Sequence, residues 1–227
     1  MMRNNKSGIN NMDFKVAIFD LDGTILDSMD LWEDIDIEFL GKRGLAVPKD
    51  YINAICARSF EEAAEYTIEL FDLKENVEDI IYEWNQMAIY KYSHEVRLRP
   101  FAREYLENLS KCGVKLSVAT GLTYELFEPA LRNNGIFNLF DYICSVDDIG
   151  KGKQFPDIYI HAAKNLKVKP EECIVFEDVL NAIQSAKKAG MKTCGVYDKY
   201  SAKDKDVIQS IADKYIYDFN EAPYPIG

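Results

Sequence analysis

Two aspartates stand two residues apart at the end of an apolar run. The run, Phe14–Phe19, is rich in Val, Ile and Phe and has the length of a buried strand. Asp20 and Asp22 follow it, and Gly23 comes next. If strand geometry persists, alternation points both carboxylates to the same side, where like charges require a compensating cation or a shared proton. An ordinary turn explains such a pattern equally well, because Asp-Gly is a common turn dipeptide.

Polar side chains also follow two other apolar runs. Thr120 and Gly121 come after a run at 114–119, and Glu177 and Asp178 come after a run at 173–176. A hydroxyl with glycine amides at a strand-to-helix turn can cradle phosphate, although a simple helix cap has the same appearance. Carboxylates directly after a buried strand are costly unless they are paired or bind a metal. Three strand ends therefore predict one site, since open α/β sheets bind ligands at the carboxyl ends of their strands.

The segments between these strand ends alternate between strand and helix patterns. Because strands that alternate with helices form a parallel sheet covered on both faces, we predict an α/β core. The expected strands cover 14–19, 114–119, 142–145, 173–176, 193–196 and 215–217, and the expected helices cover 101–111, 123–134, 157–166, 181–189 and 206–212. Residues 30–97 contain no convincing strand, and apolar residues at helical spacing predict a small helical module there. Its expected helices begin near residue 31, at Pro48, after the candidate N-cap Ser59 and after Asn76.

Composition limits the partners of this chain of 227 residues. Its 27 basic and 38 acidic residues give a net charge of −11, which argues against nucleic acid. An acidic phosphate ligand would need a cation and local Lys or Arg side chains. The five cysteines form no CxxC pair and are interpreted as buried free thiols in a reducing compartment. With no membrane-length apolar run and no signal-peptide pattern in residues 1–12, which we expect to be disordered, we predict a cytoplasmic protein without a membrane partner.

The run from residue 16 to Ser28 resembles the first motif of the haloacid dehalogenase superfamily of phosphohydrolases. By this resemblance, Asp20 is the nucleophile and Asp22 the general acid and base. Thr120 corresponds to the hydroxyl of the second motif, with Gly121 as a further phosphate contact. These assignments come from the resemblance and not from the spacing of the residues.

The segments around the remaining polar residues resemble the third and fourth motifs of the same superfamily. The third is commonly Lys-Pro-x-Pro-x-x-Phe/Tyr, and here Lys153, Pro156 and Tyr159 match while Gln154 replaces the first Pro. Lys153 would neutralise the transferring phosphoryl group, whereas Lys151 is interpreted as a solvated surface charge. In the fourth motif the acidic pair is kept, but Val179 replaces a Ser and Ala182 replaces a Gly.

The resemblance also implies a metal ion and a domain organisation. Mg²⁺ would be held by Asp20, by the carbonyl of Asp22 and by Asp178, with Glu177 acting through a water. The Rossmann-like core would comprise 13–29 and 98–227, and 30–97 would form a helical cap that closes over the site. Its position is similar to that in phosphoglycolate phosphatases and β-phosphoglucomutases. The expected protein is a Mg²⁺-dependent phosphatase of a small phosphorylated metabolite, acting through an aspartyl-phosphate as a monomer or weak dimer.

Several alternatives remain at this point. A β-phosphoglucomutase carries a His twelve residues after the nucleophile, where this chain has Trp32, an indole that cannot transfer protons usefully. Trp32 could instead line a substrate pocket, and Arg58 could meet a second anionic group, although a packing tryptophan and a surface arginine are the simpler interpretations. His94 and His161 fit no catalytic triad. A non-catalytic phosphate-binding protein and a response-regulator-like phosphoacceptor are the other classes, and the latter lacks a helical insertion.

Overall fold

The computed structural model describes residues 11–55, 58 and 60–226, and it divides into two compact units. One, here called the core unit, comprises Met1–Asp27 and Arg97–Gly227. The other, here called the helical unit, comprises Ser28–Val96. No helix within the described residues combines the length and the apolar character needed to cross a bilayer.

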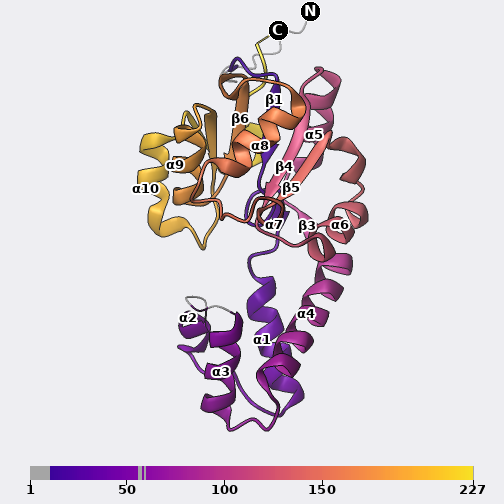
Figure 1. Cartoon of the computed structure of the whole chain (residues 1–227), viewed down its shortest axis with the longest axis vertical. Coiled ribbons are helices and arrows are strands. Elements are labelled where there is room, and N and C mark those ends of the chain that lie inside the picture. The colour runs from indigo at the N-terminus through magenta and orange to yellow at the C-terminus, as the bar shows by residue number, and fades with distance from the viewer. Residues whose placement is uncertain (1–10, 56–57, 59, 227) are drawn as a thin grey trace, which may run out of the picture. The chain divides into compact units, whose positions relative to one another are not determined.

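The core unit contains a six-stranded sheet in which every neighbouring pair is parallel. Its strand order is β5-β4-β1-β6-β7-β8, so the first strand lies between two strands from much later in the chain (Figure 1). The strands are β1 Val16–Phe19, β4 Lys115–Thr120, β5 Tyr142–Ser145, β6 Cys173–Glu177, β7 Lys192–Val196 and β8 Lys214–Ile216. This order confirms the predicted parallel, Rossmann-like sheet.

Helices connect these strands. They are α5 Ala102–Lys111, α6 Tyr124–Asn133, α7 Val146–Ile149, α8 Asp157–Leu166, α9 Leu180–Lys188 and α10 Lys205–Ile211. Short 3₁₀ turns occupy Phe137–Leu139, Pro170–Glu172, Ala202–Asp204 and Phe219–Glu221. The longer helices lie within a few residues of the predicted ranges, but α7, which is a single turn, was not predicted.

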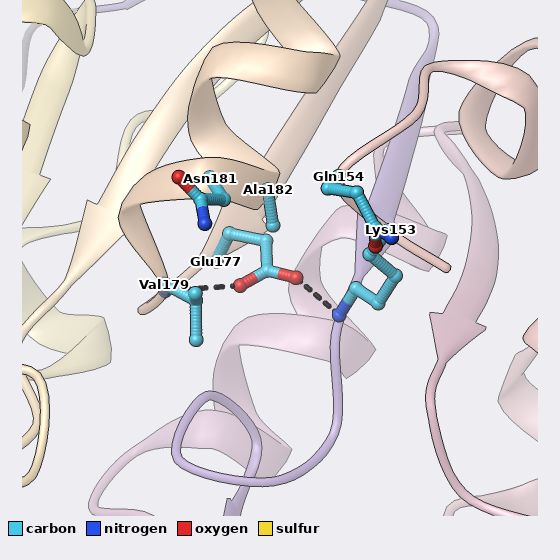
Figure 2. A pocket seen from close by; sticks show the side chains of 6 residues that line it. All are labelled: Lys153, Gln154, Glu177, Val179, Asn181 and Ala182. Atoms are coloured by element: carbon cyan, nitrogen blue, oxygen red, sulfur yellow. Dashed lines mark hydrogen bonds and ion pairs between the residues drawn. The ribbon is translucent and has the colours of Figure 1, made fainter. Parts of the chain in front are cut away.

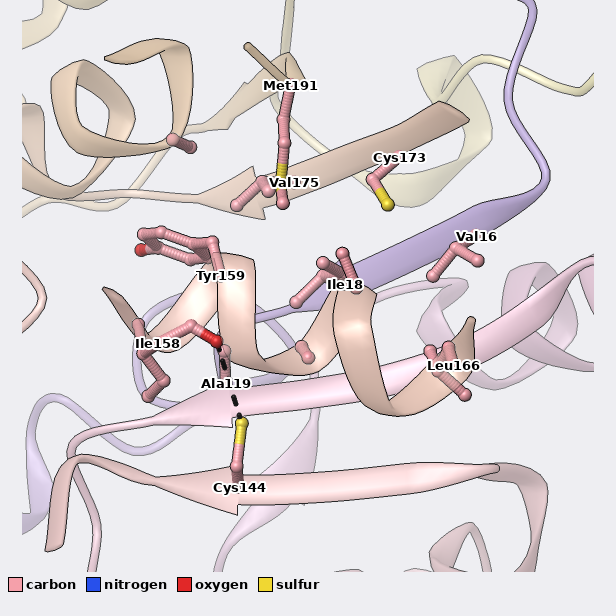
Figure 3. Close-up of a cluster of buried hydrophobic side chains, with 13 residues drawn as sticks. Val16, Ile18, Ala119, Cys144, Ile158, Tyr159, Leu166, Cys173, Val175 and Met191 are labelled. Atoms are coloured by element: carbon pink, nitrogen blue, oxygen red, sulfur yellow. Dashed lines mark hydrogen bonds between the residues drawn. The ribbon is translucent and has the colours of Figure 1, made fainter. Parts of the chain in front are cut away.

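The two faces of the sheet carry different side chains because residues along a strand alternate. On one face Val16, Ile18 and Val175 pack with side chains of α8 such as Tyr159 in a buried cluster (Figure 3). On the other face the rings of Phe19 and Phe176 stack with their centroids 4.6 Å apart. Tyr105 of α5 and Phe219 pack against both rings. Helices therefore cover both faces, as predicted.

A two-stranded antiparallel ribbon marks where the chain leaves the core unit and returns to it. It pairs β2, Leu26–Asp27, with β3, Arg97–Leu98, so that Leu26 faces Leu98 and Asp27 faces Arg97. Strands of two residues show no periodicity, which is why the sequence analysis did not find them.

The helical unit contains α1 Leu31–Lys42, α2 Tyr51–Ile55, α3 Phe60–Phe71 and α4 Val77–His94. Asn76 begins α4 as predicted, because its side chain accepts a hydrogen bond from the Asp79 amide at 2.8 Å. Helix α4 packs against α1 and α3. The indole of Trp84 there contacts the rings of Phe39 and Phe60, with centroids 5.5 Å and 6.2 Å apart. The predicted N-cap Ser59 lies outside the described residues.

Two interpretations about individual segments need comment. Cys144, Cys173 and Cys194 are buried and free, but Cys112 is exposed because it lies in the turn after α5, and its predicted burial was wrong. Cys56 lies outside the described residues. Of residues 1–12, which were expected to be disordered, Met12 pairs with Pro225 and accepts a hydrogen bond from the Ile226 amide at 3.0 Å, while residues 1–10 lie outside the described part.

Candidate active site

Asp20 lies at the carboxyl edge of the sheet, at its centre. Phe19 is paired with Val118 of β4 and with Phe176 of β6, so the next residue is level with the ends of both neighbouring strands. The Asp20 amide donates to the Phe176 carbonyl at 3.0 Å, and the residue is only 6% exposed. This edge of an open parallel sheet is where such folds bind ligands.

The chain turns sharply after Asp20. The Leu21 carbonyl accepts hydrogen bonds from the amides of Thr24, Ile25 and Leu26, at 3.2, 2.9 and 2.8 Å. Strand geometry therefore does not persist beyond Asp20, and strand alternation does not place the Asp22 carboxylate on the same side as that of Asp20. Asp22 lies half-buried in this turn, whereas Asp20 is buried.

Gly23 permits this turn to approach Asp178. Its φ is 71°, which favours glycine, and a Cβ placed there would lie 2.8 Å from Asp178 Oδ2. Thr24 Oγ1 also donates to Asp178 Oδ1, at 3.4 Å. The turn after β1 and the end of β6 are thus in direct contact, and any side chain at position 23 would separate them.

Lys153 connects the two acidic strand ends. Its Nζ lies 2.5 Å from Asp20 Oδ1 and also forms an ion pair with Glu177 (Figure 2). Burial by itself would lower the pKa of this lysine, but the charges of Asp20 and Glu177 raise that pKa well above its ordinary value. Lys151, the competing lysine, is exposed and pairs with Asp157 at 2.6 Å. Of the two lysines, only Lys153 contacts the predicted nucleophile.

Glu177 holds the neighbouring groups in place. One of its oxygens, Oε2, accepts hydrogen bonds from the amides of Asp178 and Val179 at 3.0 and 3.1 Å, and Tyr159 donates to the other at 3.3 Å. The side chain is fully buried. Its charge is therefore compensated by Lys153 and by these donors, as a buried carboxylate requires.

Three carboxylates form a candidate cation site. Ligand oxygens of Asp20, Glu177 and Asp178 lie within 4.8 Å of one another. Burial raises the pKa of Asp20 to about 7 although Lys153 opposes the change, and burial together with the charge of Glu177 raises the pKa of Asp178 to about 9. A hard divalent cation would relieve this crowding of charge, and oxygen donors are the ligands that Mg²⁺ prefers. Asp22, which was predicted to offer its backbone carbonyl, is not part of this side-chain cluster.

Thr120 and Gly121 lie at the same edge, at the end of β4. Thr120 is buried, and its Oγ1 accepts a hydrogen bond from the Leu122 amide at 3.1 Å. Gly121 is exposed, and a Cβ built on it would meet no atom within 4 Å. The strand that carries them pairs with β1, so the structure brings the predicted second motif beside the strand of Asp20.

The structure reveals a buried ion pair that the sequence analysis missed. Arg99 Nη1 donates to the Gly23 carbonyl at 2.7 Å and to Asp198 Oδ2 at 2.9 Å, and its Nη2 donates to the Tyr197 carbonyl at 2.5 Å. Both side chains are largely buried. Asp198 lies just beyond a buried strand, the same signal that identified Asp178, whereas nothing in the local pattern indicates Arg99.

Two predicted specificity residues belong to the helical unit. Trp32 is half-buried on α1, and its ring packs edge-on against Phe60 with centroids 5.6 Å apart. Arg58 is exposed, donates to the Ala54 carbonyl and lies over the ring of Tyr66 at 4.4 Å. These contacts are internal to the helical unit. The two histidines form separate hydrogen bonds, His94 with the Tyr90 carbonyl and His161 with the Tyr142 hydroxyl.

Comparison with known proteins identifies the class. Residues 17–196 match the family of haloacid dehalogenase-like hydrolases. The chain is 32% identical over 187 residues to YhcW of Bacillus subtilis (strain 168), covering 82% of this chain and 84% of the relative. This chain therefore belongs to the haloacid dehalogenase-like hydrolases, and the family predicted from its motifs is confirmed.

Other relatives agree with this family assignment. A phosphorylated carbohydrates phosphatase of Thermotoga maritima is 26% identical over 178 residues, covering 78% of this chain and 82% of the relative. Among solved structures, a β-phosphoglucomutase of Clostridium difficile has a TM-score of 0.68 at 21% identity, covering 93% of this chain and 94% of the other. That likeness shows the shared fold, in agreement with the predicted α/β class.

Proposed function

We propose that this protein is a Mg²⁺-dependent phosphatase that hydrolyses a small phosphorylated metabolite. The observation that carries the proposal is the contact of Lys153 with Asp20, in a buried site where Glu177 and Asp178 supply further carboxylates. A buried carboxylate held by a cation at a sheet edge is arranged for nucleophilic attack on phosphorus. The relatives named as phosphatases, one of them for phosphorylated carbohydrates, support the same reaction class.

The reaction has two displacement steps on phosphorus. In the first, an Asp20 oxygen attacks, an aspartyl-phosphate forms, and the bond to the leaving oxygen breaks as Asp22 gives that oxygen its proton. In the second, Asp22 takes a proton from water, which attacks phosphorus and releases inorganic phosphate and free Asp20. Asp22 lies half-buried in a loop, where it can exchange protons with solvent.

Fixed groups around the phosphoryl oxygens would stabilise the developing charge. Lys153 supplies a buried positive charge, and the Thr120 hydroxyl with the Gly121 amide offers neutral donors at the neighbouring strand end. Asp20 and Asp178, with the Asp22 carbonyl, would hold Mg²⁺, which supplies electrostatic stabilisation to the transferring group when bound. Glu177 keeps Lys153 oriented and charged.

A phosphate-release assay with an aryl phosphate tests this function. The chain should release phosphate with Mg²⁺, lose activity in EDTA and recover it when Mg²⁺ is restored. Lys153→Ala should abolish turnover, because it removes the cation beside Asp20. Lys151→Ala is the matched control and should retain activity, because that lysine pairs with Asp157 on the surface. Full activity after chelation would contradict the metal assignment, and no release at all would favour a non-catalytic binding protein.

A phosphomutase is the second candidate, since it would use the same four motifs. The residue twelve positions after Asp20 is Trp32, which packs against Phe60 and cannot transfer protons usefully. This observation favours hydrolysis. The two activities separate when β-glucose 1-phosphate is supplied with catalytic glucose 1,6-bisphosphate. Rapid formation of glucose 6-phosphate with little free phosphate would identify a mutase instead.

A further inference from the structure

A pocket of about 430 Å³ adjoins the candidate active site within the core unit, a volume in the range of small-molecule sites. Its lining residues are Lys153, Gln154, Glu177, Val179, Asn181 and Ala182 (Figure 2). Glu177 lies between the residues of the α9 segment on one side and Lys153 with Gln154 on the other. The pocket therefore begins at the ion pair that orients the nucleophile.

The pocket is also where this chain departs from the motifs it otherwise matches. Gln154 replaces a Pro of the third motif, and Val179 and Ala182 replace a Ser and a Gly of the fourth. Gln154 lies in a loop, whereas Val179 caps α9 and Ala182 lies in its first turn, yet all three line the same pocket. Lys153 and Glu177, which line the pocket and contact the reacting groups, match the motifs. The three residues that differ from the motifs only shape the pocket.

The polar groups of the pocket that have no partner within the described part of the protein are neutral amides. Gln154 and Asn181 are exposed, and their side-chain amides have no hydrogen-bond partner among the described residues. Lys153 and Glu177 compensate each other's charge, so the pocket offers no unpaired cation to a second anionic group. Val179 is 48% exposed, and its isopropyl group adds an apolar surface. Amide groups beside an apolar surface suit a ligand with several hydroxyl groups on a carbon skeleton.

We propose that this pocket binds the hydroxyl-bearing leaving group of the substrate, which makes the substrate class a sugar or polyol phosphate. Gln154 and Asn181 bond to its hydroxyls, and Val179 contacts its carbon face. Lys153 lines the pocket, and its Nζ also lies 2.5 Å from Asp20 Oδ1. A substrate whose phosphoryl group contacts Asp20 therefore has its leaving group next to the pocket. The proposal rests on the phosphatase function above and adds a substrate class to it.

Paired substrates test the proposal. Hydrolysis of a panel of hexose and hexitol phosphates is compared with that of n-hexyl phosphate, which has the same number of carbons but no hydroxyl groups on them. The best hydroxylated ester should exceed hexyl phosphate in kcat/KM. The double substitution Gln154→Ala with Asn181→Ala should reduce this preference roughly tenfold, as expected for two lost hydrogen bonds. Hexyl phosphate hydrolysis should fall by a smaller factor, because that substrate has no hydroxyl groups that could lose these bonds.

Controls make each outcome decisive. Gln184→Ala removes an exposed amide from α9 outside the pocket lining and should leave the preference intact. Equal hydrolysis of both substrate types by the native chain would overturn the pocket assignment, as would a double variant that keeps the preference or loses both activities alike. Failure of the native chain to hydrolyse any ester, aryl phosphates included, would instead overturn the phosphatase function itself.

Discussion

The candidate active site in the core unit and helix α1 in the helical unit place buried carboxylates in opposite surroundings. In the core unit Lys153 lies between Asp20 and Glu177, and Arg99 is paired with Asp198. In the helical unit Asp36 is 6% exposed on α1 and has no hydrogen-bond or ion-pair partner among the described residues. Paired charges cost less to bury and hold one another in a fixed arrangement. The comparison indicates that the buried charges of the candidate site stabilise one another, whereas Asp36 is buried at the expense of stability. Lys91, which is also buried in the helical unit, is paired with Glu95.

Asp36 shows the cost directly. Burial, with a smaller contribution from the charge of Glu33, raises the pKa of this carboxyl to about 7. The nearby Tyr51 hydroxyl cannot compensate the charge, because it is engaged with Thr67 at 2.8 Å. A second polar atom in the same unit, Trp84 Nε1, is also buried without a partner among the described residues. The core unit contains two such atoms, Ser117 Oγ and Ser185 Oγ, so the helical unit is distinguished by the uncompensated charge of Asp36 and not by the number of unpaired polar atoms.

The largest expected effect comes from Asp20→Asn. The amide has nearly the same shape but is a poor nucleophile, so phosphate release should fall by many orders of magnitude while the fold is kept. Circular dichroism and a phosphate-release assay check both parts. Asp27→Asn, which changes an exposed aspartate on β2, is the control and should remain active. Substantial activity of the Asp20 variant in a clean preparation would exclude this residue as the nucleophile.

Asp22→Asn should reduce turnover by roughly 10²–10⁴, the usual worth of general acid–base catalysis. The loss should be smaller for aryl phosphates than for alkyl phosphates, because an aryl leaving group needs little protonation. Measuring both substrates with one preparation provides an internal control. Equal losses for the two would argue against an acid role for Asp22.

Asp36→Asn should stabilise the helical unit at neutral and alkaline pH. The pKa of the Asp36 carboxyl is higher in the folded state than its ordinary value of 3.8. Ionisation of this group therefore lowers the free energy of unfolding as pH rises from about 4 to about 7, by at most about 4 kcal/mol. The variant should lack this decline, so its advantage appears at pH 8 and vanishes near pH 4. Urea unfolding followed by tryptophan fluorescence measures it, since both tryptophans, Trp32 and Trp84, lie in this unit.

The exposed Asp34 on the same helix supplies the control for that measurement. Asp34→Asn should leave the pH dependence of unfolding unchanged. A pH profile for Asp36→Asn that parallels the native one would show that the Asp36 carboxyl does not carry the unfavourable charge.

Arg99→Lys should give the smallest effect, a fall in kcat of roughly 10-fold to 100-fold from misplacement of the Asp22 loop. Lysine keeps the charge but cannot reach the Gly23 carbonyl, Asp198 and the Tyr197 carbonyl with one planar group. The expected signature is a loss in kcat with little change in KM. Arg97→Lys, an exposed neighbour on β3, should behave like the native chain. A loss confined to KM would contradict this positioning role.

The sequence predicted the elements whose patterns are local. Phe14–Phe19 and Cys173–Phe176 are apolar runs of strand length, and the acids that follow them stand out because burial makes them costly. The helix that was predicted to begin after Ser59 is observed as α3, Phe60–Phe71. Lys153 was singled out by a motif, and the structure places it against Asp20.

Some features that escaped prediction depend on contacts between distant parts of the chain, and others on local geometry that residue spacing does not show. Arg99 acquires its role from the Gly23 carbonyl and from Asp198, 99 residues away, and no local pattern encodes either contact. The turn after Asp20 is set by three amides that converge on the Leu21 carbonyl. Asp36 could have been noticed, because it stands four residues after Trp32 and three before Phe39, on the apolar side of its helix.

The ribbon of β2 and β3 has a consequence for how this chain can change. Because Asp27 faces Arg97 across the ladder, the entire segment 28–96 enters and leaves the core unit through two adjacent residues. Segment 28–96 is therefore equivalent to a loop of the core unit whose ends are held together by the ribbon. Doubling the length of such a loop raises the entropic cost of loop closure by only about 0.6 kcal/mol. Insertions, deletions or complete exchange of segment 28–96 can therefore occur without rearranging the sheet. The helical unit is thus attached at a point where changes in its sequence disturb the six-stranded sheet least.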